Sequence, residues 1–300
     1  MFESDLAGSF DGIGIEIAIK KDQLTIVAPL KDTPSYKAGL KSGDIIVKIN
    51  DKSTSDITTE EAVNMIRGQK NTNVVLTIFR EGWRNTKDFT ITRDTIKIAS
   101  IDWELKNQNI AYIHIYQFDQ NLSEDFKKIA LEILKSPAKK IIIDLRDNPG
   151  GYLEVCQDIA GWFLQRGQIV TIEDFGKDKD QHKYLAQGNS DFANYPVVIL
   201  INKGSASASE ILAGALRDNR NTKLIGEKSF GKGSVQTVIN LKNSESFLKI
   251  TIAKWLTPKG DSISEVGLNP DIKIAITDTD FEAKKDPQLN KALEIINDLK

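Results

Sequence analysis

Ser207 and Lys232 are the residues of this chain whose types and surroundings could do chemistry. The serine lies in residues 204–211 (GSASASEI) and the lysine in residues 231–236 (GKGSVQ). A serine hydroxyl is a weak nucleophile at neutral pH and needs a general base within hydrogen-bond reach. A lysine amine can be that base where burial lowers its pKa, because desolvation disfavours the ammonium. Together they predict a serine hydrolase that uses no histidine.

The serine also fits a structural role. Ser207 and Glu210 have the S-x-x-E spacing of a capping box at the start of a helix. Residues 196–202 have the pattern of a buried parallel strand and residues 211–216 that of a buried helix. The serine is therefore placed at a strand-to-helix turn, where the amides of the helix can stabilise an oxyanion. Cap and nucleophile share this geometry, so both remain open. Glu210 either completes the cap or touches the site, and the cap is the preferred interpretation.

Lys232 needs the same scrutiny, because a lysine between glycines is most often a solvated loop residue. In the strand that the following residues predict, the side chains of Lys232, Ser234 and Gln236 would share one face. The Gln236 carbonyl oxygen could accept a hydrogen bond from the lysine amine and orient it, as an aspartate orients the histidine of a triad. The spacing therefore predicts a Ser207–Lys232 dyad with Gln236 as its orienting residue.

These motifs resemble those of the carboxyl-terminal processing peptidases, also called tail-specific proteases. In that family the serine of the second Ser-Ala step is the nucleophile, the lysine is the general base and the glutamine four residues later positions it. The resemblance implies these roles for Ser207, Lys232 and Gln236. It extends to residues 143–151 (IDLRDNPGG), 255–260 (WLTPKG) and 267–271 (GLNPD), and so covers nearly the whole chain. It implies a crotonase-like protease core that needs no cofactor.

The glycine pair in residues 148–151 (NPGG) follows a predicted strand end. Its structural interpretation is a tight turn that needs a positive φ at glycine. Its functional interpretation is an oxyanion donor, the N–H of Gly150 or Gly151, paired with the N–H of Ala208. The sequence does not choose between the two glycines.

The first hundred residues resemble a PDZ domain. Short strands are predicted at 12–17, 23–27, 44–50 and 74–80, with a helix at 58–67. The GIGI segment is similar to the carboxylate-binding loop of that domain, so the N–H groups of Ile13, Gly14 and Ile15 are expected to hold a substrate's terminal carboxylate. Arg67, after the predicted helix, is a candidate for coupling the domains; an exposed helix-end arginine is the alternative.

From about residue 97 predicted strands and helices alternate, which indicates an α/β core with a helix-covered sheet. The expected fold class is α/β (α+β), with a crotonase-like protease core and a PDZ domain at its N-terminal side. Leu289, Leu293 and Ile296 form an apolar stripe in a last helix. The expected boundaries are an N-terminal remnant at 1–11, a PDZ domain at 12–96, the Ser/Lys protease core at 97–277 and a helical tail at 278–300.

Composition narrows the possible functions. The chain has 300 residues, a net charge of −2 and no basic run interleaved with aromatics, which argues against nucleic-acid binding. The single Cys156 is expected to be a buried structural thiol. His114 and His182 are far apart, so no metal site is expected. Residues 226–233 match G-x-x-x-x-G-K but end in glycine, where a phosphate-binding loop has the Ser/Thr that ligates magnesium.

No secretory signal and no apolar run of membrane-spanning length is visible in the sequence. The family that the chain resembles is mostly exported or membrane-anchored in bacteria. The resemblance therefore implies a periplasmic, secreted or membrane-anchored location, and we expect the sequence to be part of a longer protein. Expected partners are protein or peptide substrates with apolar carboxyl termini, and further copies of the chain through regions partly missing here.

The predicted reaction is endoproteolysis near the carboxyl terminus of protein substrates, through an acyl-enzyme and with the tail recognised by the PDZ domain. The alternative is a catalytically silent protein of the same fold that binds tails or other ligands. The intact set of Ser207, Lys232 and Gln236 favours the enzyme. An acyl-CoA enzyme on the same core would give no reason for this set or for a PDZ domain.

Overall fold

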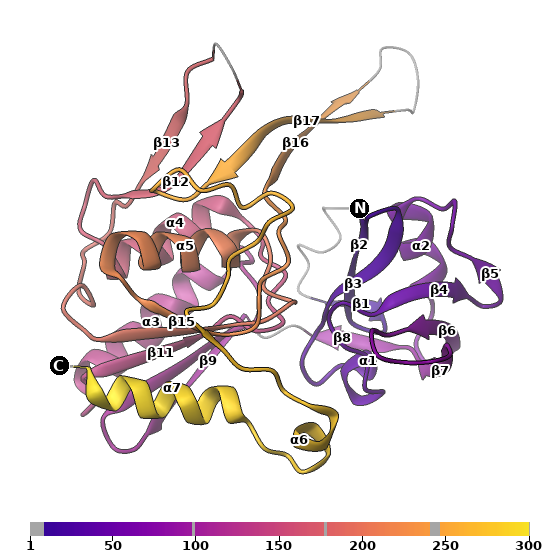
Figure 1. Ribbon diagram of the computed structural model, residues 1–300, viewed down its shortest axis with the longest axis horizontal. Helices are drawn as coiled ribbons and strands as arrows, with labels where there is room; N and C mark the ends of the chain where they lie inside the picture. The colour runs from indigo at the N-terminus through magenta and orange to yellow at the C-terminus, as the bar shows by residue number, and fades with distance from the viewer. Residues whose placement is uncertain (1–8, 98–99, 177–178, 241–246, 300) are drawn as a thin grey trace.

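The computed structural model describes residues 9–97, 100–176, 179–240 and 247–299 of the chain. Two domains lie side by side (Figure 1). The N-terminal domain is built on a sheet of order β2-β3-β4-β6-β7, with β5 paired to β4. Its elements are β2 (Ile15–Lys20), β3 (Gln23–Pro29), α1 (Pro34–Lys37), β4 (Ile45–Ile49), β5 (Lys52–Ser53), α2 (Thr59–Ile66), β6 (Asn73–Phe79) and β7 (Lys87–Thr92).

Alternating side chains make the core of this domain. In β6 every second residue is buried, namely Val74, Leu76 and Ile78, as the period of two along a strand requires. A capping box formed by Thr58 and Glu61 starts α2. The ends of the domain are joined by a separate antiparallel pair, β1 (Ser9–Gly12) and β8 (Asp94–Lys97).

The core domain is a six-stranded sheet of order β18-β15-β14-β11-β10-β9, parallel except for its edge strand β9. Its central strand β14 is buried at every position, because helices cover both faces of the sheet. α3, α4 and α5 pack on one face and α7 on the other. The elements are β9 (Ile101–Lys106), β10 (Ile110–Ile115), α3 (Leu122–Lys135), β11 (Lys140–Asp144), α4 (Leu153–Phe163), β14 (Val197–Ile201), α5 (Ala208–Arg220), β15 (Lys223–Gly226), β18 (Ile272–Lys273) and α7 (Pro287–Asp298).

A second sheet of order β13-β12-β17-β16 belongs to the core domain. Its two hairpins extend away from the helices as two arms (Figure 1). The strands are β12 (Ile169–Asp174), β13 (His182–Leu185), β16 (Ser234–Asn240) and β17 (Phe247–Leu256). Because β16 begins two residues after Lys232, this sheet is attached directly to the candidate site.

Most predicted strands and helices of both domains are present, with the helix at 58–67 observed as α2 and the last apolar stripe packed on the sheet as part of α7. The strand predicted at 12–17 is wrong in part, because the chain leaves β1 at Gly12 and enters β2 only at Ile15. The arm strands β12, β13 and β17 were not predicted, and the short helix α6 (Asp278–Glu282) lies within the predicted helical tail. Within the described ranges, no helix is long and apolar enough to cross a membrane.

Candidate active site

Ser207 occupies a strained turn between β14 and α5. Its φ and ψ are 55° and −118°, a conformation that residues with a Cβ rarely adopt and that costs about 1–3 kcal/mol. The chain must turn this sharply to lead from a buried strand into a buried helix, and a serine at such a turn projects at the end of the sheet. The Glu210 half of the expected capping box is also present, with the Ser207 N–H donating to the Glu210 carboxylate at 3.0 Å. The two interpretations of Ser207 are therefore compatible.

The neighbouring serines have structural bonds. The Ser205 hydroxyl donates to the Leu145 carbonyl at 2.8 Å, and the Ser209 hydroxyl to the Asn148 carbonyl at 3.0 Å. Both serines are fully buried, whereas Ser207 is half-buried. Of the three serines in the motif, Ser207 is the one that a substrate can reach.

Asn148 organises the glycine turn that faces the serine. Its side-chain amide donates to the Ile115 carbonyl at 2.7 Å, and its side-chain oxygen accepts the Gly150 N–H at 2.9 Å. Its backbone carbonyl accepts the Ala206 N–H at 3.0 Å, which ties this turn to the turn of the serine. Sequence analysis did not single out Asn148, although it lies inside the NPGG motif.

Gly150 and Gly151 differ in what their N–H groups do. The Gly150 N–H is used by Asn148, and the Gly150 carbonyl accepts from the Phe118 N–H at 2.9 Å. Across a trans peptide the next N–H points the opposite way, so the Gly151 N–H is directed away from Phe118. A Cβ on Gly150 would lie 2.7 Å from the Ser207 Cβ and 2.9 Å from the Ala208 nitrogen. The glycine turn is therefore in close contact with the serine turn and has no room for a side chain at Gly150. Gly150 also has a φ of 97°, which favours glycine.

Glu210 fastens the lysine segment to the serine turn. Its carboxylate is 1% exposed and accepts hydrogen bonds from the Ser207 N–H, from the Gly231 and Lys232 N–H groups at 2.7 and 2.9 Å, and from the Ser229 hydroxyl at 2.6 Å. Burial raises the pKa of Glu210, and these hydrogen bonds counteract the rise. The sequence left open whether this residue completes the cap or touches the site, and it does both, because it bonds the backbone of Ser207 and of Lys232.

The Lys232 side chain points to the N-terminal domain. Its Nζ donates to the Glu16 carboxylate at 3.1 Å, and no hydrogen bond to Ser207 is found among the described residues. The Glu16 charge raises the pKa of Lys232 above its ordinary value, and desolvation only partly opposes it. This is the opposite of the shift that a general base requires. Local sequence gave no signal for the pair, because the partners are 216 residues apart.

Gln236 lies on β16 with an exposed side chain. Within the part of the chain that the structure describes, this side chain makes no hydrogen bond to Lys232. The orienting role of Gln236 therefore stays a prediction. It requires the Lys232 side chain to leave Glu16 and adopt another position.

The predicted tail-binding segment borders a small groove in the N-terminal domain. The groove has a volume of about 60 Å³ and lies between the β1–β2 segment and α2. Arg67, the C-cap of α2, also lines it. Most of its other lining side chains are apolar; the full lining is Gly12, Ile13, Gly14, Ile15, Ile17, Val63, Ile66 and Arg67.

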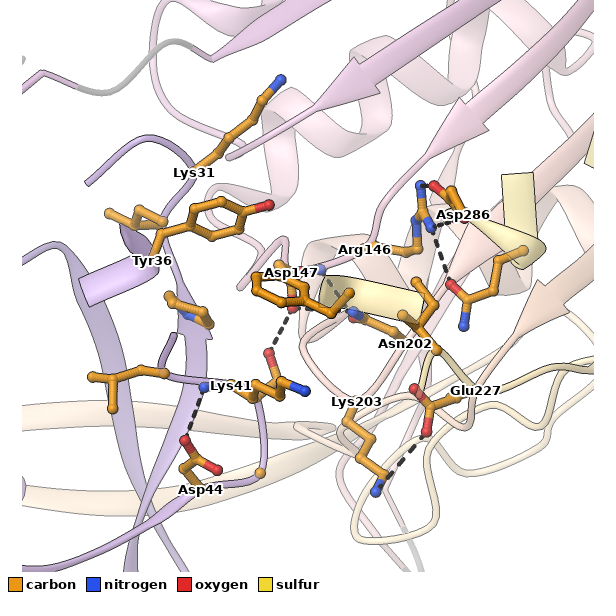
Figure 2. A pocket seen from close by; sticks show the side chains of 18 of the residues that line it. Lys31, Tyr36, Lys41, Asp44, Arg146, Asp147, Asn202, Lys203, Glu227 and Asp286 are labelled. Carbon is orange, nitrogen blue, oxygen red and sulfur yellow. Dashed lines mark hydrogen bonds and ion pairs between the residues drawn. The ribbon is translucent and has the colours of Figure 1, made fainter. Parts of the chain in front are cut away.

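A larger cleft of about 1110 Å³ is lined by residues of both domains. Figure 2 shows it between Tyr36 and Lys41 of the N-terminal domain and Asp147 and Lys203 of the core domain. Neither Ser207 nor Lys232 lines this cleft. One bridge across the domains, from the Ser42 hydroxyl to Asp147 at 2.7 Å, lies at its edge.

The remaining chemical candidates are structural. Cys156 is buried, and burial raises the pKa of its thiol, so the thiolate is disfavoured. The described residues hold no cluster of His, Cys, Asp and Glu that could bind a metal. After the G-x-x-x-x-G-K segment the chain continues as β16, where a phosphate-binding loop requires a helix.

Models of two known families match the chain, one in each domain. Residues 109–274 match Peptidase family S41, and this match spans more than half of the chain. The chain belongs to peptidase family S41. Residues 25–80 match the PDZ domain, so the N-terminal domain of this S41 chain is a PDZ domain.

Curated relatives include a probable CtpA-like serine protease of Staphylococcus epidermidis, 39% identical over 274 residues, which are 91% of this chain and 55% of that protein. A probable CtpA-like serine protease of Staphylococcus aureus is 38% identical over 273 residues, or 91% of this chain and 54% of that protein. The S41 chain thus spans about half the length of these relatives. Among solved structures, a photosystem II D1 C-terminal processing protease superposes with a TM-score of 0.83 at 26% identity, over 94% of this chain and 77% of that chain.

Proposed function

We propose that this S41 chain carries the catalytic part of a serine endopeptidase that cleaves near the carboxyl terminus of protein substrates. The observation that carries the proposal is the strained turn of Ser207, which Glu210 bonds to the backbone of Lys232. A merely structural serine would not need this strain, and a merely structural glutamate would not need to collect donors from both segments.

The proposed reaction begins with attack of the Ser207 hydroxyl oxygen on the scissile carbonyl, while the neutral Lys232 amine takes the hydroxyl proton. The N–H groups of Gly151 and Ala208 stabilise the oxyanion of the tetrahedral intermediate. Gly151 is favoured over Gly150, whose N–H is already bonded to Asn148. The lysine returns the proton to the leaving amine, and water then hydrolyses the acyl-enzyme.

The pairing of Lys232 with Glu16 is proposed to be a resting arrangement. A lysine held as an ammonium by a carboxylate cannot accept the serine proton. The Lys232 side chain is 43% exposed, so it has room to turn from Glu16 to the serine once the PDZ domain moves. In that position Gln236 is proposed to orient the amine.

The PDZ groove is proposed to select the substrate tail. The apolar side chains of Ile15, Ile17, Val63 and Ile66 favour an apolar carboxyl-terminal residue, and the GIGI backbone favours its carboxylate. The partners are thus proteins or peptides with apolar carboxyl termini. The proposed location, outside the bacterial cytoplasm, rests on the resemblance to carboxyl-terminal processing peptidases.

The test is hydrolysis of an unstructured protein that ends in apolar residues. We expect Ser207→Ala and Lys232→Ala each to lower kcat/KM by at least about 1000-fold, because each removes a partner in the same chemical step. Ser123→Ala on α3 and the exposed Lys228→Ala are matched controls that should retain activity. A substrate with an amidated terminus should be cut more slowly.

Two results would contradict the proposal. Cleavage by Ser207→Ala at the wild-type rate would show that the nucleophile is elsewhere. Tail binding without any cleavage by the full-length protein would support the catalytically silent alternative.

A further inference from the structure

A pair of side chains joins the two turns of the proposed active site where they leave the sheet. The Asp147 N–H donates to the Asn202 side-chain oxygen at 2.9 Å, and the Asn202 side-chain amide donates back to the Asp147 carboxylate at 3.0 Å. The two bonds close a ring between the turn after β11, which leads to the glycine pair, and the turn after β14, which leads to the serine. Figure 2 shows both residues on the core-domain side of the large cleft.

This pair continues the contact between β11 and β14 beyond the ends of the strands. At the strand ends, the Leu145 N–H donates to the Leu200 carbonyl at 3.0 Å. Within the turns, the Ala206 N–H donates to the Asn148 carbonyl. The pair lies between these two bonds along both chains, so it adds a link at the point where both chains turn away from the sheet.

Asn202 also organises its own turn. Its side-chain oxygen accepts a second hydrogen bond, from the Gly204 N–H at 2.9 Å, and its backbone N–H donates to the Ser205 hydroxyl oxygen at 2.9 Å. The two turns are in contact here as well, because a Cβ on Gly204 would lie 2.8 Å from the Asp147 Cα. A change in the bonds between Asp147 and Asn202 therefore acts on the segment that leads to Ser207.

Asp147 is suited to this place by its residue type. Its φ is 53°, in the left-handed region that aspartate and asparagine adopt more readily than other residues with a Cβ. Gly151, whose N–H is proposed to bind the oxyanion, follows four residues later, and Ser207 follows Asn202 by five residues. Each member of the pair therefore fixes the start of a short segment that carries one part of the proposed reaction.

Both side chains of the pair line the large cleft, which neither Ser207 nor Lys232 lines. From the PDZ domain, the Ser42 hydroxyl donates at 2.7 Å to the Asp147 oxygen that also accepts from Asn202. This contact is added to the pair and replaces neither of its two bonds. An effect of the pair on the reaction must therefore pass through the turns.

We infer that Asp147 and Asn202 are positioning residues, which hold the Ser207 hydroxyl and the Gly151 N–H at the separation that attack on a carbonyl requires. The inference rests on the proposed peptidase function and deepens it by naming the side chains that keep the nucleophile and the oxyanion donor together. The oxyanion forms only on the way to the transition state, so an error in this separation should lower kcat and leave KM nearly unchanged.

The experiment reverses the pair with substitutions of nearly equal size and measures kcat and KM on an unstructured peptide that ends in apolar residues. Asn202→Asp sets a second carboxylate against Asp147, so the turns repel each other and kcat should fall by about 100-fold. Asp147→Asn, added to that variant, again places one amide against one carboxylate, and kcat should return to within about fivefold of the wild-type value.

Two controls accompany this comparison. Asn189→Asp is the matched substitution, because Asn189 and Asp191 form another amide–carboxylate pair, exposed and on a different loop, at 2.6 Å. It should leave kcat unchanged. Ser42→Ala removes the contact from the PDZ domain and keeps the pair, so it should not reproduce the loss. Urea titration checks that each variant is folded under the conditions of the assay.

Three results would overturn the inference. They are an unchanged kcat in folded Asn202→Asp, a reversed pair that does not recover, and a loss in Ser42→Ala equal to that in Asn202→Asp.

Labelling of Ser207 by a fluorophosphonate separates this inference from the proposed function. In that reaction the serine oxygen displaces fluoride from phosphorus while the base takes the hydroxyl proton, and no peptide is required. A wild-type protein that is labelled but cleaves nothing would contradict the peptidase function. A labelling rate that falls in Asn202→Asp and recovers in the reversed pair would still support the positioning role.

Discussion

At the scale of single residues, the protonation of Lys232 depends on a partner from another domain. A general base must be neutral before it can accept a proton, so catalysis rises as the pH rises through the pKa of the lysine. Glu16 raises that pKa by favouring the ammonium. The proposed general base is therefore held, in the arrangement described, in the protonation state that cannot accept a proton.

Glu16→Gln tests this control. Removing the carboxylate should lower the pKa of Lys232, so the acidic limb of the profile of kcat/KM against pH should move to lower pH and activity at neutral pH should rise several-fold. Glu81→Gln is the control, because Glu81 forms another ion pair between the domains, with Lys203 at 3.5 Å. It should leave the position of the limb unchanged. If the acidic limb of the kcat/KM profile does not move in Glu16→Gln, the ion pair with Glu16 does not determine the pKa of Lys232.

At the scale of elements, the geometry of the proposed active site comes from two turns in contact at the carboxyl ends of β11 and β14. The turn after β11 carries Gly150 and the turn after β14 carries Ser207. These strands are parallel neighbours in the sheet, which brings their ends to one edge. The contact leaves no room for a Cβ at Gly150, where it would lie 2.6 Å from the Ala206 carbonyl oxygen.

Gly150→Ala should therefore abolish activity by displacing the serine turn. Gly167→Ala is a matched control, since Gly167 has a φ of 91° against 97° for Gly150, and a Cβ there would meet nothing within 4 Å. Both substitutions carry a backbone cost of about 1–2 kcal/mol. Only Gly150→Ala should lose kcat/KM, measured on the same peptide. Equal activity of the two variants would mean that the turn tolerates the displacement.

At the scale of the whole molecule, a buried ion network holds the last helix on the sheet. Arg146 follows β11, and its guanidinium donates to Asp144 at 2.5 Å and to Asp286, the N-cap of α7, at 2.8 Å. Burial by itself would raise the pKa of Asp144, but the guanidinium and the hydrogen bonds hold that pKa below its ordinary value. The network thus joins the middle of the chain to its end.

Arg146→Lys should lower the free energy of unfolding by about 3–5 kcal/mol, because a lysine cannot bridge both carboxylates and leaves buried charge unpaired. The contribution of Asp144 should persist at neutral pH and decline as the pH falls below about 4, since its pKa is depressed in the folded state. Lys128→Gln, at the exposed pair with Asp125, should cost far less than Arg146→Lys, because solvent screens that pair. Urea titration of both variants gives the comparison; equal losses would contradict the role of the network.

The sequence by itself determined the strands and helices that carry the site. Every residue of β14 is buried because both faces of that strand are covered. In β6 every second residue is buried because only one face is covered. Both patterns can be recognised within a short stretch of sequence. The motif around Ser207 likewise placed a serine at a strand-to-helix turn, because Ser207 and Glu210 are three residues apart and their capping box is local.

Tertiary structure alone decided how these residues meet. Glu210 accepts from the lysine segment, Asn148 selects which glycine N–H stays available, and Glu16 takes the lysine side chain. None of these pairings leaves a periodic signal, because each joins segments that come together only when the sheets and domains pack. The same reason applies to the contact between Val27 and Ala206. The bulge that carries Val27 and the turn that carries Ala206 belong to different domains and meet only when the domains pack.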